Sequence, residues 1–204
     1  MLPSKQTGPV HNTSSSCLTS WGENPSKGLK LRILADKHLD SVHISLLSDT
    51  HGHMDERVLH HVKGSDEIWH AGDIGDLAVT DALGKIALCR AVFGNIDGQE
   101  IRQEWPEHLH FETGGATVWM THIGGRPPKY AKGILPELTK RRPTLLVCGH
   151  SHILLVKKVE RWGGLHLNPG AAGISGFHKV RTMLRFEIHD GTVSNMRVIE
   201  WPRR

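Results

Sequence analysis

Short apolar runs of the kind that form β-strands recur along the chain, and five of them end in a small residue and a polar side chain able to bind a metal ion. These runs span residues 42–47, 67–69, 91–93, 117–120 and 144–148. Short β-rich runs that end in turn-forming residues are typical of buried strands. Helices are predicted between the runs, at residues 55–62, 76–88 and 132–142.

The order of these elements predicts an α/β fold. The first two helices follow a strand–loop–helix order, which implies parallel strands joined by crossover helices. After residue 152 the pattern is strand-like throughout, at 153–159, 165–168, 182–188 and 193–199, and Asp190-Gly191 is a hairpin signal between the last two strands. An α/β first part followed by a β-rich second part indicates two sheets packed face to face with helices outside.

Residues 1–40 differ in composition from the rest of the chain. Gly8-Pro9 and Asn24-Pro25 are loop signals in a stretch with little apolar surface to bury. A short alternating stretch at 29–33 is compatible with an extra edge strand. We predict a poorly ordered N-terminal extension at residues 1–40 that adds nothing to the chemistry, followed by a single domain at 41–204.

Composition and charge narrow the class of protein. With 38% hydrophobic and 23% charged residues among 204, the chain is typical of globular proteins and is long enough for one well-buried domain. A formal net charge of +4 without a long Lys/Arg run supports an anionic substrate only weakly and disfavours nucleic acid as a partner. The three cysteines lack framework spacing, and no apolar segment is long enough for a membrane span or a signal peptide. We therefore predict a cytoplasmic protein with reduced thiols and no membrane partner.

Seven polar side chains follow the five strand-like runs. They are Asp49, His51, Asp73, Asn95, His122, His150 and His152. Because strands present their following loops at one edge of a sheet, such residues converge in one cleft. Mixed Asp, His and Asn ligands suit divalent cations such as Mn²⁺, Fe²⁺, Zn²⁺, Co²⁺ or Ni²⁺. Seven ligands exceed the needs of one tetrahedral ion but suit two ions bridged by a carboxylate, and two ions about 3.5–4 Å apart clamp a phosphoryl group and acidify a bridging water.

The motifs that contain these residues resemble the calcineurin-like metallophosphoesterase superfamily. The resemblance rests on Asp49-Thr-His51, Gly72-Asp73, Gly94-Asn95-Ile-Asp97, Thr121-His122, Gly149-His150-Ser-His152 and Asn168-Pro169-Gly170. The small size and the motif order are most similar to the short prokaryotic phosphodiesterase branch. The resemblance implies a four-layer α/β/β/α sandwich, in which two mixed sheets pack face to face with helices outside and a dinuclear metal centre lies on one edge.

The resemblance also implies a role for each ligand. Asp49, His51 and His152 would hold one metal ion, Asn95, His122 and His150 would hold the other, and Asp73 would bridge them. A hydroxide that bridges two divalent ions, with Mn²⁺ the expected metal, would attack phosphorus in line. Asp73, Asn95 and His122 are the expected catalytic residues. The predicted function is hydrolysis of a small phosphodiester or other phosphoester.

Two departures from the superfamily's pattern concern the substrate. Many members have a His after the Gly-Asn pair that can protonate the leaving oxygen, whereas Ile96 occupies this position here and cannot transfer a proton. The lack of a general acid favours diesters or substrates with good leaving groups, unless a water or Asp97 substitutes. After His122, where many members have a second His, this chain has a Gly/Pro-rich loop that carries Arg126, which is either a phosphate contact or a solvated cation. His53, beside the first ligand loop, is a further candidate for lining the cleft.

The sequence is compatible with three functions. The complete ligand set, together with Ile96 in place of a general acid, favours a metal-dependent phosphodiesterase. A non-catalytic metal-binding scaffold of the same fold would typically have lost ligands, and none is missing here. A nuclease would share the chemistry but would need a nucleic-acid-binding face. The sequence also leaves a homo-oligomer open. Among the remaining histidines, His70 is expected to pack or hydrogen-bond behind Asp73, and His178 shows no ligand-like spacing.

Overall fold

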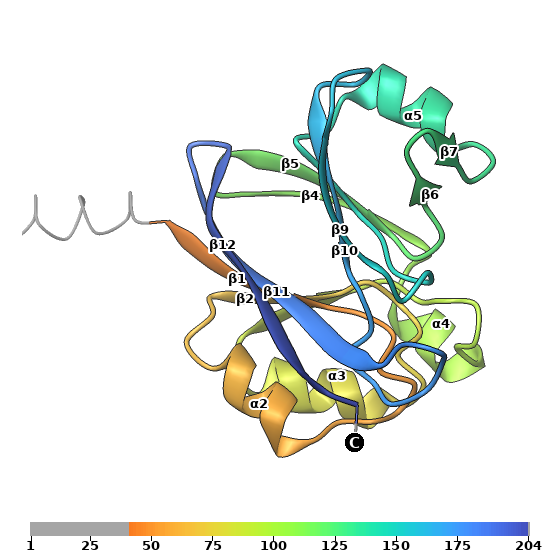
Figure 1. Cartoon of the computed structure of the whole chain (residues 1–204), viewed down its shortest axis with the longest axis vertical. Coiled ribbons are helices and arrows are strands. Elements are labelled where there is room, and N and C mark those ends of the chain that lie inside the picture. The colour runs from red at the N-terminus through yellow and green to blue at the C-terminus, as the bar shows by residue number, and fades with distance from the viewer. Residues whose placement is uncertain (1–40, 204) are drawn as a thin grey trace, which may run out of the picture. The chain divides into compact units, whose positions relative to one another are not determined.

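A computed structural model describes residues 41–203, which form two five-stranded sheets packed face to face (Figure 1). The predictions for residues 1–40, including the strand at 29–33, lie outside the described residues. The first sheet has the order β12-β11-β1-β2-β3 and is built from β1 (Val42–Leu47), β2 (Glu67–His70), β3 (Leu88–Ala91), β11 (Val180–His189) and β12 (Thr192–Pro202). The second has the order β4-β5-β8-β10-β9 and is built from β4 (His108–Thr113), β5 (Ala116–Thr121), β8 (Leu145–Val147), β9 (Leu154–Val159) and β10 (Gly164–Pro169).

The helices lie on the outer faces of the two sheets (Figure 1). α2 (Glu56–Val62) and α3 (Leu77–Gly84) connect the parallel strands β1, β2 and β3 and pack on the first sheet, and the short α4 (Gln99–Glu104) follows β3. α5 (Ile134–Arg141) connects the parallel strands β5 and β8 and packs on the second sheet. A two-stranded ribbon, β6 (Gly125–Arg126) and β7 (Lys129–Tyr130), precedes α5. The predicted four-layer α/β/β/α sandwich is confirmed.

Alternation along the strands assigns side chains to the layers. In β1, Ile44 and Leu46 pack between the sheets, whereas Leu47 faces the helices. In β5, Met120 packs between the sheets and Trp119 faces α5. Each such side chain contributes about 1.5–3 kcal/mol when it leaves water. The three apolar layers therefore fix the strand ends, and with them the loops that follow.

The differences from the predicted elements lie mainly at polar or short segments. α3 ends at Gly84, whereas the helical pattern extended to residue 88, and β3 ends at Ala91 although the strand was expected at 91–93. Neither α4 nor β4 was predicted. β4 is an edge strand whose histidines and Glu112 alternate with half-buried residues, so it lacks the apolar run that marked the other strands.

The described residues include no helix long and apolar enough to cross a membrane.

Candidate metal centre

The seven predicted ligands come together in the loops at the carboxyl ends of β1, β2, β3, β5 and β8. The acidic and histidine side chains form two groups, Asp49 with His51 and His152, and Asp73 with His122 and His150. Within each group, the potential ligand atoms lie within 4.8 Å of one another. The seventh side chain, Asn95, places its Oδ1 3.1 Å from His122 Nε2. The geometry therefore fits the predicted division of the ligands, and their roles in metal binding stay a prediction.

Asp73 lies between the two groups. Its Oδ1 is 3.1 Å from His122 Nε2, and its Oδ2 is 3.8 Å from His51 Nε2. The Ile96 N–H also donates to Oδ1, at 3.1 Å. The carboxyl group is buried, and burial, the largest single influence, would raise its pKa. The hydrogen bond with His122, the charges of His122 and His51 and the Ile96 N–H together outweigh burial, and the pKa is lowered. Asp73 thus offers an ionised carboxylate with one oxygen toward each group, as a bridging ligand requires.

In both groups, ring nitrogens of the histidines lie close to carboxylate oxygens or to another ring nitrogen, and a cation between these atoms would stabilise the arrangement. In one group, His152 Nε2 lies 3.4 Å from His51 Nε2 and 3.2 Å from an oxygen of Asp49. In the other, His122 Nδ1 donates to the Ala71 carbonyl at 2.8 Å, so a neutral His122 turns the lone pair of Nε2 toward the Asp73 carboxylate. Acceptors in such contact need a proton or a metal ion between them. The donor set therefore fits divalent cations.

The pKa of His122 also indicates that the carboxylates favour a positive charge at this position. Burial lowers the pKa of the ring, but the hydrogen bond with Asp73 and the nearby carboxylates outweigh burial, and the pKa is raised. A raised pKa means that a positive charge at this position is stabilised. A proton and a metal ion therefore compete for Nε2 of His122, because the imidazole must be neutral to bind metal.

Backbone strain concentrates on the predicted ligands. Five of them have positive φ angles, namely Asp49 (56°), His51 (50°), Asp73 (52°), His150 (67°) and His152 (57°). Such angles are uncommon for residues other than glycine and cost on the order of 1–3 kcal/mol each. The loops are held in place by backbone hydrogen bonds, including Asp49 N–H to the Gly72 carbonyl and His51 N–H to the Asp73 carbonyl, both 3.0 Å. Strain maintained in this way is characteristic of functional sites.

His70 lies behind the ligand loops, as expected, and connects two of them. The Gly72 N–H donates to His70 Nδ1 at 3.2 Å, so a neutral ring carries its proton on Nε2. That proton is donated to Thr50 Oγ1 at 2.9 Å, and the Thr50 hydroxyl donates to the Ile74 carbonyl at 2.9 Å. Burial lowers the pKa of His70 to about 4, which keeps the ring neutral near pH 7. This chain of hydrogen bonds fixes the loop after β1 against the loop after β2.

Asp97, predicted as a substrate contact or substitute acid, is directed into the protein. The side chain is buried, and its carboxylate accepts the N–H groups of Ile74 at 3.1 Å, Gly75 at 2.7 Å and Gly94 at 2.7 Å. These bonds hold the loop after β2 against the loop that carries Asn95. The structure gives Asp97 a structural function and does not bring it to the cavity beside the ligands.

The two other predicted substrate residues lie outside both ligand groups. Arg126 is exposed on the β6–β7 ribbon and does not line the cavity beside the ligands. His53 Nε2 lies 3.4 Å from the carboxylate of Asp55, the residue that caps α2. Their contacts with a substrate stay predictions.

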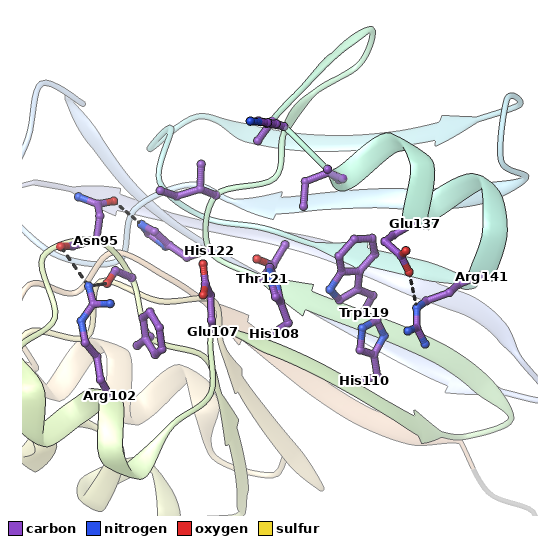
Figure 2. A pocket seen from close by; sticks show the side chains of 17 residues that line it. Asn95, Arg102, Glu107, His108, His110, Trp119, Thr121, His122, Glu137 and Arg141 are labelled. Atoms are coloured by element: carbon purple, nitrogen blue, oxygen red, sulfur yellow. Dashed lines mark hydrogen bonds and ion pairs between the residues drawn. The ribbon is translucent and has the colours of Figure 1, made fainter.

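A cavity of about 670 Å³ extends from the second ligand group along β4 and β5 to α5 (Figure 2). Asn95 and His122 line it at one end, and the Glu137–Arg141 ion pair, 2.8 Å long, lies at the other. Trp119 forms part of the wall between them. The sequence did not reveal this cavity, because its wall depends on the pairing of β5 with β4, a strand that has no apolar signature.

The sequence of residues 42–191 matches the model of the calcineurin-like phosphoesterase superfamily domain, and the chain belongs to this family. A comparison with curated proteins found no match. Three solved structures have a similar fold and low sequence identity. An archaeal phosphodiesterase is 19% identical and has a TM-score of 0.59, over 78% of this chain and 99% of that one. A predicted phosphoesterase from Streptococcus pneumoniae TIGR4 is 23% identical, with a TM-score of 0.57, over 80% and 91%. Wild-type Vps29 from Entamoeba histolytica, complexed with Zn²⁺, is 17% identical, with a TM-score of 0.61, over 79% and 99%.

Gly94 allows the loop of Asn95 to approach Asp73, and we expect Gly94→Ala to disturb the centre. A Cβ at this position would collide with the backbone N and Oδ1 of Asp73. Overpacking of this kind costs about 1–3 kcal/mol. The free energy of unfolding measured with urea should fall by this amount, and the urea midpoint should fall with it. Gly84→Ala is the matched control, because a Cβ there meets no atom within 4 Å and the helical position favours alanine. Equal midpoints for the two variants would contradict the close approach.

Proposed function

We propose that the protein is a metal-dependent phosphodiesterase that hydrolyses small phosphodiesters at a dinuclear centre. The proposal rests on the position of Asp73, which directs one carboxylate oxygen toward each ligand group. Two divalent cations, with Mn²⁺ as the expected metal, would supply Lewis-acid stabilisation of charge on the phosphoryl oxygens and would acidify the attacking water. Asp49, His51 and His152 would hold one cation, Asn95, His122 and His150 the other, and Asp73 both.

The residues of the chain orient the ligands and the phosphate. The Ile96 N–H donates to Oδ1 of Asp73 and so holds the carboxylate in one rotamer. Because Asn95 directs its Oδ1 to His122, its amide NH₂ is left to donate to a phosphoryl oxygen from the wall of the cavity. A donor preorganised in this way lowers the barrier by stabilising charge that develops in the transition state.

The surroundings of Asn95 support a diester as the substrate. Ile96 is 47% exposed and offers no proton to a leaving oxygen. Asp97 is engaged by three backbone N–H groups and does not replace it. The cavity that begins at Asn95 is lined by both apolar and charged side chains, Phe93 and Arg102 among them, and it provides room for a second ester group. A phosphodiester with a good leaving group fits these features.

Bis-p-nitrophenyl phosphate and p-nitrophenyl phosphate test the proposal, because they share one leaving group and differ in the second ester. With the full-length chain and Mn²⁺, we expect kcat/KM for the diester to exceed that for the monoester by at least about tenfold, or about 1.4 kcal/mol. A preference for the monoester would contradict the diester assignment. Absence of hydrolysis of both compounds by metal-loaded protein would contradict the proposed function as a whole.

A non-catalytic scaffold is the second candidate, and a specific observation favours it. Ile96, Ile123 and Ile153 each follow a predicted ligand and are between 44% and 58% exposed, and Phe177 is fully exposed. Apolar side chains gathered around a site are typical of protein-binding surfaces. Vps29 structures are also among those with a similar fold. Metal-loaded protein that hydrolyses neither nitrophenyl ester would favour this function.

A further inference from the structure

His178 contacts the back of a predicted metal ligand, although nothing in its sequence spacing indicated this. It lies in the segment between β10 and β11, and its Nδ1 is 3.3 Å from His152 Nδ1. The other ring nitrogen of His178, Nε2, is 3.0 Å from the carbonyl oxygen of Gly173. The His152 ring therefore has His178 at Nδ1 and the Asp49 carboxylate, 3.2 Å away, at Nε2.

The Gly173 carbonyl determines which nitrogens of these two rings carry protons. A carbonyl oxygen only accepts, so His178 Nε2 carries a proton and donates it to Gly173. In neutral His178, Nδ1 is then an acceptor, and the His152 Nδ1–H donates to it. A neutral His152 that carries its proton on Nδ1 has a free lone pair on Nε2. This is the nitrogen directed to Asp49 and His51.

The segment that contains the Gly173 carbonyl is hydrogen-bonded to the loop of Asp49. The Gly173 N–H donates to the Asp49 carbonyl at 3.1 Å, and the Ala172 N–H donates to the Ser48 carbonyl at 2.9 Å. The path from Asp49 through Gly173 and His178 to His152 thus returns to the Asp49 carboxylate. Two ligands of the same group are held relative to each other through His178.

The backbone at Gly176 permits the contact between the two rings. Its φ is 110°, and a Cβ at this position would collide with the His152 ring and lie 3.3 Å from His178 Nδ1. Arg203 also holds the segment, because its guanidinium donates to the carbonyl groups of Ile174 and His178. The close approach of the loop is therefore built into the fold and does not depend on one side chain.

We propose that His178 is a positioning residue, which holds His152 in the orientation and tautomer that leave Nε2 free to bind a metal ion. The inference rests on the proposed function, because it assumes that the group of Asp49, His51 and His152 binds metal. The Ala71 carbonyl stands in the same relation to His122, as acceptor for Nδ1 in the other group. Such partners of metal-binding histidines typically contribute about 10- to 100-fold in metal affinity.

Three substitutions of His178 and one control separate positioning from packing. In His178→Asn, the amide oxygen takes the place of the Nδ1 acceptor; in His178→Gln, it lies nearer the place of Nε2; and His178→Leu has no acceptor. His189→Leu is the control, because His189 is exposed at the end of β11, remote from the ligand loops in the fold. Calorimetric titration of Mn²⁺ into metal-free full-length protein gives the number and affinity of the sites. Thermal unfolding of the metal-free variants checks that each is folded.

We expect one of two Mn²⁺ sites to weaken by about 10- to 100-fold in His178→Leu and His178→Gln, and to keep an affinity near that of the wild type in His178→Asn. Equal Mn²⁺ affinity in His178→Leu and wild type would overturn the inference. If the Leu variant does not fold, the comparison of Asn with Gln decides, and equal affinities there would likewise overturn it. Wild-type protein that binds no Mn²⁺ contradicts the proposed function instead, so the two failures are distinguishable.

Discussion

Asp73→Asn is expected to lower kcat/KM for bis-p-nitrophenyl phosphate by about 1,000-fold, which corresponds to about 4 kcal/mol of transition-state stabilisation. The reason is that the Asp73 oxygens face both ligand groups, so one substitution removes negative charge from both. Asparagine has the same shape, and its amide oxygen can still accept the Ile96 N–H. The substitution therefore tests charge and metal bridging with little change in packing.

Asp81→Asn is the matched control for this experiment, because Asp81 lies exposed on α3, away from the ligand loops. Its kcat/KM should equal that of the wild type. Steady-state kinetics with Mn²⁺ at one fixed pH give the comparison. Retention of more than about a tenth of the wild-type kcat/KM by Asp73→Asn, a loss below 1.4 kcal/mol, would contradict a bridging carboxylate.

Removal of divalent metal is expected to abolish hydrolysis and to lower the melting temperature. A ligand present at 100 times its Kd stabilises the folded state by about 2.7 kcal/mol, which for a chain of this size corresponds to a shift of roughly 5–10 °C. The stabilisation has a structural reason, since the centre gathers carboxylates, ring nitrogens and five ligands with positive φ that a cation would hold together.

Dialysis against a chelator, followed by thermal unfolding and an activity assay, measures both effects. Added Mn²⁺ should restore the melting temperature and the activity together. Asp73→Asn provides the internal control, because its melting temperature should respond less to Mn²⁺ than that of the wild type. Full activity in protein shown to be free of metal would contradict the account.

The sequence predicted the parts of the fold that depend on local pattern. The run at residues 42–47 is β1, because its apolar side chains fill the layers on both faces of the sheet. The ligands could be predicted because each follows a strand, and strand ends meet at one edge of a sheet. β4 could not, since its polar alternation becomes meaningful only through its pairing with β5.

The contributions of His178 and Asp97 could not be predicted for a related reason. His178 contacts His152 because the backbone of residues 172 and 173 pairs with the loop of Asp49, a long-range contact that leaves no spacing signal. Asp97 belongs to the Gly-Asn-Ile-Asp motif, which suggested a place beside the substrate. Three backbone N–H groups orient its carboxylate toward the interior instead.

Metal stoichiometry is a direct test of the dinuclear centre, because two ligand groups that share Asp73 should bind two ions. The measurement is calorimetric titration of Mn²⁺ into metal-free full-length protein, with the bound metal then counted by elemental analysis. We expect two Mn²⁺ ions per chain in the wild type and fewer than two in Asp73→Asn. A single ion or none in the wild type, or two ions bound with unchanged affinity in Asp73→Asn, would contradict a dinuclear centre bridged by Asp73.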